Sequence, residues 1–181
     1  MVFWATLYRL YGMTHRPDPD LTAAIKAATR SAIERLRSEE VGPFCLYALV
    51  TSGEALRPYL SITLDDSDRW NPSEGPFDVY GDEFFAPLKS IYDERGDIFD
   101  MAPDAGEAEY RVRLLSMEAA LRELDESGLF GSGAEREKVL LLVTAMPPDE
   151  TDAEFAQRLN PDGPLLTAWL QEASEGHVAD A

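Results

Sequence analysis

The chain has 181 residues, which is enough for one domain with a buried core and short for two. Its 16 Lys and Arg residues face 34 Asp and Glu residues, and the formal net charge of −18 disfavours bare nucleic acid as a ligand. Hydrophobic residues make up 45% of the chain, too many for wholesale disorder. We therefore predict one domain over residues 14–174, preceded by an apolar segment at 1–13 and followed by a frayed tail at 175–181.

The acidic excess is concentrated in one part of the sequence. Residues 65–109 contain 14 carboxylates and only three basic residues. If these carboxylates share one side of the fold, they form an acidic face that attracts a basic partner. Solubility, or adaptation to high salt, would explain the same composition, so the charge alone does not decide between these interpretations.

The first 13 residues, MVFWATLYRLYGM, are apolar, with several large side chains at helical spacing, although the run could also serve as an extra strand. We expect this segment to be ordered and buried against the domain core or against a second copy in a homodimer, since an exposed patch of this size is unusual. It is too short to span a bilayer and lacks the features of a signal peptide. The single cysteine, Cys45, excludes an intramolecular disulfide. Both features predict a cytoplasmic protein that does not associate with membranes.

The elements expected next along the chain are a helix and two strands. Residues 20–38 carry an apolar stripe at helical spacing, and Asp18 with Pro19, or Asp20, suits the cap and first turn. Residues 44–51 and 57–64 have strand patterns and are separated by the turn-like SGEAL, which favours an antiparallel pair.

The second half of the sequence predicts further helices and one more strand. A short helix begins at Asp82 and is interrupted or bent at Pro87, and a longer helix covers 107–126. The apolar run 139–145 suits a strand covered on both faces, which we place at the centre of the sheet. Two helices follow, one capped by Thr151 or Asp152 and one at 164–173. The fold class predicted is α+β, with a small, mainly antiparallel sheet of three to four strands covered by helices.

The loop after the second strand, DDSDRW, combines three carboxylates with a tryptophan, namely Asp65, Asp66, Asp68 and Trp70. The spacing of these carboxylates does not match the calcium loop of an EF-hand, and neither His15 nor His177 belongs to a zinc motif. A looser Mg²⁺ site stays open as an alternative. We take solvated turn carboxylates as the better interpretation, and we predict no metal, no cofactor and no catalytic residue.

Several segments together resemble a known family. These segments are LTAAIKAATRSAIERL, FCLYALVTS, YLSITL, RWNPSEG, LRELDESGLFG, VLLLVTAMPPDE and RLNP, which span about residues 21–162. The chain resembles an uncharacterised family of small bacterial cytoplasmic proteins, some of which resemble immunity proteins of polymorphic toxin systems. The resemblance implies binding and inhibition of a partner, and it brings no catalytic residues.

The sequence thus favours a non-catalytic acidic binding protein that masks a basic partner, such as a nuclease toxin. Asp65, Asp66 and Asp68 would supply charge, and Trp70 would be the buried aromatic anchor. Two alternatives stay open for the whole chain, a metal-dependent hydrolase that uses the same three carboxylates and an acidic housekeeping protein with no toxin. Trp70 has its own alternative, since it would equally well pack its loop onto the domain.

Overall fold

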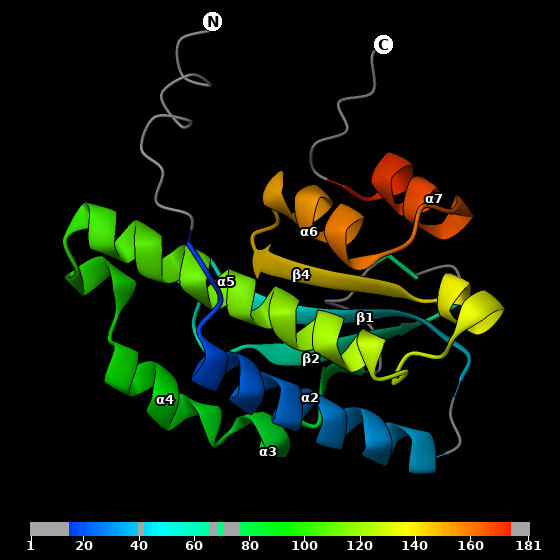
Figure 1. Cartoon of the computed structure of the whole chain (residues 1–181), viewed down its shortest axis with the longest axis horizontal. Helices are drawn as coiled ribbons and strands as arrows, with labels where there is room; N and C mark the ends of the chain where they lie inside the picture. The colour runs from blue at the N-terminus through cyan, green and yellow to red at the C-terminus, as the bar shows by residue number, and fades with distance from the viewer. Residues whose placement is uncertain (1–14, 40–41, 66–68, 71–76, 175–181) are drawn as a thin grey trace, which may run out of the picture.

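Four strands form one mixed sheet with the order β3-β2-β1-β4 (Figure 1). The computed structural model describes residues 15–39, 42–65, 69–70 and 77–174. The strands are β1 (Phe44–Ser52), β2 (Tyr59–Leu64), β3 (Phe77–Tyr80) and β4 (Leu140–Met146). β2 runs antiparallel to both β1 and β3, whereas β4 runs parallel to β1. The α+β class and the mainly antiparallel sheet are confirmed.

Helices cover both faces of this sheet (Figure 1). One side carries α2 (Pro19–Ser38), α3 (Asp82–Phe85), α4 (Leu88–Arg95) and α5 (Pro103–Glu126). The chain returns through α6 (Thr151–Leu159) and α7 (Pro164–Glu172) on the other side. Two short 3₁₀ turns, η1 (Ile98–Asp100) and η2 (Gly133–Lys138), flank α5.

Alternation along β1 divides the core into two clusters. Tyr47 and Leu49 pack with α2, α4 and α5, while Leu46, Ala48 and Val50 pack with α7. Successive side chains of a strand point to opposite faces, so a strand buried on both faces reads as a continuous apolar run. This is the pattern of β1, whose interior residues are all buried.

The helix predicted over residues 20–38 is confirmed together with its cap. The Asp18 carboxylate accepts a hydrogen bond from the Leu21 amide at 2.9 Å, and Pro19 occupies the first turn. Proline suits this position because its missing N–H would have no intrahelical partner there. The apolar stripe of α2 faces the core as expected.

The position predicted for strand 139–145 is wrong, because β4 lies at the edge of the sheet. Its side chains are nonetheless buried on both faces up to Ala145. An apolar run indicates that a strand is buried, but it does not indicate how many strands pair with it. Helix α6 lies beside β4 and supplies Ala156 to one core cluster and Phe155 to the other. Protection of the open edge by a helix is a usual way to prevent pairing with another chain.

Asn160 closes part of that edge at the end of α6. Its side-chain oxygen accepts a hydrogen bond from the Leu141 amide at 2.8 Å, and its side-chain nitrogen donates to the Leu141 carbonyl at 2.7 Å. The side chain therefore pairs with β4 as a neighbouring strand would. Arg136 donates to the same oxygen at 3.2 Å, which joins η2 to this contact.

Three details differ from the sequence predictions. The α6 helix has no side-chain cap; instead, Asp149 accepts from the Thr151 amide, and Asp152 is buried and accepts from the Thr144 hydroxyl at 2.6 Å. The long helix begins at Pro103 rather than near residue 107. The strand β3 was not predicted, because four half-exposed residues give too short a pattern. The predictions for residues 1–13 and 175–181 fall outside the described residues.

Replacing Asn160 by Ala should lower the free energy of unfolding by roughly 2–4 kcal/mol, because two buried backbone groups of Leu141 lose their partners. Urea denaturation of the purified variant measures this loss. The exposed neighbour Asp162 provides the control, and Asp162→Ala should stay within about 0.5 kcal/mol of the wild type. Equal losses in the two variants would contradict the role assigned to Asn160.

Candidate functional site

The predicted acidic loop is partly described by the structure. Asp66 and Asp68 lie outside the described residues, while Asp65 is exposed and lies 3.8 Å from the Arg69 guanidinium. Trp70 is half-buried and packs against the apolar cluster beneath α7. Its indole N–H donates to the Glu172 carboxylate at 2.7 Å, and the Arg69 guanidinium lies 4.4 Å from the centre of its ring.

These contacts give Trp70 a role within the chain. The hydrogen bond from Trp70, followed by the charge of Arg69, lowers the pKa of the Glu172 carboxyl. The loop is also held beneath Trp70, because the Thr63 hydroxyl donates to the Arg69 carbonyl at 2.6 Å. Trp70 therefore joins the loop after β2 to α7, whereas partner binding by Asp65, Asp66, Asp68 and Trp70 stays a prediction.

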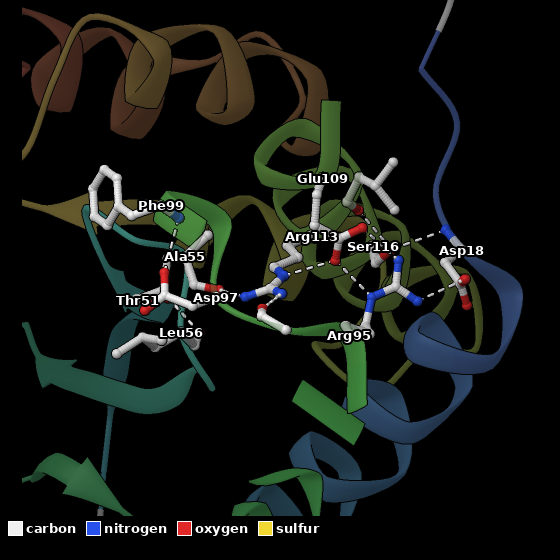
Figure 2. A network of polar contacts seen from close by, with 12 residues as sticks. Asp18, Thr51, Ala55, Leu56, Arg95, Asp97, Phe99, Glu109, Arg113 and Ser116 are labelled. Atoms are coloured by element: carbon white, nitrogen blue, oxygen red, sulfur yellow. Dashed lines mark hydrogen bonds and ion pairs between the residues drawn. The ribbon is translucent and has the colours of Figure 1, made fainter. Parts of the chain in front are cut away.

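A second site of interest is a network of charged side chains between α2, α4 and α5 (Figure 2). Arg95 donates to both oxygens of Glu109, at 2.7 and 3.0 Å, and to Asp18 at 2.9 Å. Arg113 donates to the same Glu109 at 2.8 Å, and only 1% of its side chain is exposed. Two carboxylates thus balance two guanidinium groups, and Glu109 is shared between Arg95 and Arg113.

The pKa values in the network follow from these contacts. Burial alone would raise the pKa of Glu109, but hydrogen bonds and charge from Arg95 and Arg113 outweigh it and lower this pKa. The Leu21 amide, and then Arg95, lower the pKa of Asp18. Both carboxylates are consequently ionised at neutral pH, and each stabilises the fold through its charged form.

The remaining donors of Arg113 bind the backbone of two loops. They reach the Ala55 carbonyl at 3.2 Å and the Gly96 carbonyl at 2.5 Å. Ala55 has a φ of 47°, which is uncommon for a residue with a side chain, and its carbonyl is held by this contact. The turn after β1 and the loop after α4 are therefore fixed side by side.

The loop after α4 presents a large exposed aromatic residue, Phe99, of which 71% is accessible. The loop is nevertheless firmly held. The Asp97 carboxylate accepts from the Phe99 amide at 2.9 Å, and α5 approaches so closely at Gly106 that a Cβ there would lie 2.5 Å from the Ile98 carbonyl oxygen. Only glycine allows this approach, which fixes η1 on the surface of α5.

Beside Phe99 the surface is hollowed, with a cavity volume of about 420 Å³. The cavity is lined by Gly53, Ile98, Phe99, Met101, Pro103, Gly106, Glu107 and Tyr110. Gly53 directly follows β1, and its amide binds the Met146 carbonyl at the end of the parallel strand β4. The cavity therefore lies beyond the carboxyl ends of two parallel strands, which is a common ligand position in open α/β sheets.

Exposed apolar side chains gather at this end of the sheet. Leu56, Phe99 and Met146 are three of the four large hydrophobic side chains exposed among the described residues, and all three belong to segments that meet here. We call these three residues and the cavity beside Phe99 the strand-end face. An apolar group of this kind with a polar surround has the composition of a protein-binding surface.

The surround is acidic. Residues 96–110 contain five carboxylates and no Lys or Arg. Glu109 is paired internally, whereas the other four, Asp97, Asp100, Asp104 and Glu107, are exposed. Burial, followed by the charges of Asp149, Asp152 and Glu107, raises the pKa of the Tyr110 phenol at the cavity wall. The strand-end face therefore carries a negative potential.

Sequence reasoning named the DDSDRW loop, whose partner binding stays a prediction, and overlooked Phe99. DDSDRW attracts attention through its density of charge, but its tryptophan finds partners within the chain. The segment GDIFDMAP carries the better signal, namely three large apolar residues between an N-capping Asp97 and Pro103. Its meaning depends on contacts with Gly106 and Arg113 of α5, which the local pattern does not reveal.

Among the described residues no group of three or more His, Cys, Asp or Glu side chains is arranged to hold a metal ion. The part of the chain described here also contains no helix with the length and apolar character needed to cross a bilayer. The chemistry available at the strand-end face is apolar contact, aromatic contact and attraction of positive charge.

Comparison with protein families assigns the chain to one family. The model of a family described as a domain of unknown function, DUF4303, matches residues 25–161. The chain belongs to this family. The matched region includes all four strands, Arg95, Glu109 and Arg113, and it includes Phe99, but α7 lies outside it. Comparisons with curated proteins and with solved structures gave no match.

The Glu109→Gln variant should lose about 3 kcal/mol of unfolding free energy at pH 7, because the buried Arg113 loses its carboxylate partner and the partly buried Arg95 is left with Asp18. The pKa of Glu109 is lowered by folding, so its contribution is complete above the ordinary value of 4.5 and is lost as the pH falls through the lower folded value. The difference between wild type and variant should therefore shrink in acid. Urea denaturation from pH 7 to about pH 3 measures it.

Glu107→Gln is the matched control for that series. Glu107 lies on the same helix and pairs with Arg111, but 59% of its side chain is exposed. We expect a loss of at most about 0.5 kcal/mol, with little dependence on pH. A Glu109→Gln variant that behaved like Glu107→Gln would show that the network does not support the fold.

Trp70→Ala should lower the free energy of unfolding by about 2 kcal/mol, since the half-buried ring leaves the cluster beneath α7. Trp70→Phe should recover most of the loss, because packing contributes more than the exposed hydrogen bond. Thermal denaturation compares both with Asp65→Asn, which changes an exposed carboxylate of the same loop. Unchanged melting of Trp70→Ala would instead leave the ring available as a partner anchor.

Proposed function

We propose that this chain is a non-catalytic, cytoplasmic binding protein that docks a basic protein on the strand-end face. The observation that carries the proposal is Phe99, which is 71% exposed on a loop fixed by Asp97, Gly106 and Arg113. A ring that lies largely outside the core contributes little to folding, whereas an anchor on a fixed loop binds without losing much backbone entropy.

The charge of the surround supports a basic partner. Asp97, Asp100, Asp104 and Glu107 flank Phe99, and Asp149 and Glu150 follow the end of β4, and all six are exposed. Carboxylates around an apolar centre speed the encounter with a positively charged surface and exclude acidic partners. A central aromatic residue then supplies most of the resistance to dissociation.

Inhibition of a toxin is the form of this function that the resemblance to immunity proteins favours. A nuclease has a basic substrate channel, and an acidic face with an aromatic anchor has the complementary chemistry. In this proposal the partner's active site is masked by the strand-end face, and the chain itself performs no reaction. In this proposal Trp70 joins its loop to α7, and partner binding by Asp65, Asp66, Asp68 and Trp70 stays a separate prediction.

The test is capture from a lysate of the native host by immobilised full-length wild type, Phe99→Ala and Val79→Ala. Val79 is the matched control because it is 53% exposed but lies on β3, which contributes nothing to the cavity. We expect a basic protein to be retained by wild type and Val79→Ala and lost by Phe99→Ala. With the purified partner, Phe99→Ala should weaken binding by about 30-fold or more.

Salt provides the second measurement on the purified pair. The association rate should fall steeply as ionic strength rises, because the exposed carboxylates act over distances that salt screens. The proposal would be overturned by a partner whose affinity is unchanged in Phe99→Ala and whose association rate does not depend on salt. The proposal would also be overturned if every protein retained by the wild type were retained equally by Phe99→Ala.

A further inference from the structure

We infer that the cavity beside Phe99 receives one arginine or lysine side chain. This inference deepens the proposed function, on which it rests, because it names the group of the basic partner that the strand-end face recognises. The cavity of about 420 Å³ lies within the size range of ligand pockets and has room for one long side chain.

The walls suit a long apolar stem. Ile98, Met101 and Pro103 supply aliphatic surface, and the rings of Phe99 and Tyr110 also line the cavity. Arginine and lysine carry three or four methylene groups that pack on such surfaces while the charged end stays hydrated. Aromatic rings also attract a cation placed over their faces.

The charge at the cavity selects a cation. Glu107 is the charged residue among those that line it. Glu107 currently pairs with Arg111 at 2.7 Å, but both side chains are largely exposed, so an incoming cation exchanges with Arg111 at little cost. The raised pKa of Tyr110, caused first by burial and then by Asp149, Asp152 and Glu107, is consistent with a negative potential at the wall.

The guanidinium of Arg113, which lies inside the fold nearby, does not occupy the cavity. Arg113 is buried, and its donors are directed to Glu109, Ala55 and Gly96. An anionic ligand such as a phosphate would meet the Glu107 carboxylate, which already engages the Arg111 guanidinium, and a purely apolar ligand would desolvate Glu107 without compensation. A cation on an apolar stem can pack its methylene groups on the apolar walls and pair its charge with the Glu107 carboxylate.

The test is an NMR titration of the full chain with arginine capped as its N-acetyl N-methylamide, with capped citrulline as the matched neutral probe. Capped arginine should shift the resonances of Gly53, Gly106 and Tyr110 with millimolar affinity, and capped citrulline should bind at least about threefold more weakly. Glu107→Gln should remove this preference. Glu135→Gln, which changes an exposed carboxylate outside the cavity, should preserve it.

Equal shifts by arginine and citrulline, or shifts confined to residues outside the cavity, would overturn the inference. The capture experiment separates this failure from failure of the proposed function. If a basic partner depends on Phe99 while capped arginine leaves the cavity unperturbed, the strand-end face binds its partner without this side-chain pocket. If neither result is obtained, both proposals are wrong.

Discussion

The pairing of Glu109 with two arginines is the interaction on which the arrangement of the helices depends. Arg95 extends from the end of α4 and also binds Asp18 at the start of α2, while Arg113 lies one helical turn after Glu109 on α5. Isolated buried charges are costly, and here each is compensated by an opposite charge and by hydrogen bonds. The helix α2 is thereby fixed to α4 and α5, from which it is distant in the sequence.

The same network determines the shape of the strand-end face. Arg113 binds the carbonyls of Ala55 and Gly96, and so it joins the turn after β1 to the loop that carries Phe99. The interior of the protein and its proposed binding surface share this one side chain. A rigid surface is the expected result, because movement of the Phe99 loop would break a hydrogen bond to a buried charge.

Local patterns predict much of the fold but little of the site. The cap of α2, the pair formed by β1 and β2, and the interruption at Pro87 all depend on residues close in sequence, and each is confirmed. The edge position of β4 depends on α6 and Asn160, which the apolar run does not reveal. The charged network depends on Asp18, Arg95 and Glu109, which are separated by up to 91 positions and look individually like surface residues.

Trp70 and Phe99 show why an aromatic residue beside carboxylates is an ambiguous signal. The Trp70 indole carries an N–H donor, which finds Glu172 on α7, and its ring has an apolar cluster within reach. Phe99 has no donor to satisfy, and its neighbour Ile98 is the residue held against Gly106. Fixing Ile98 on α5 leaves Phe99 directed to solvent. The difference between a packing residue and an exposed anchor is therefore decided by the nearest helix, α7 for one ring and α5 for the other, rather than by the charges beside either ring.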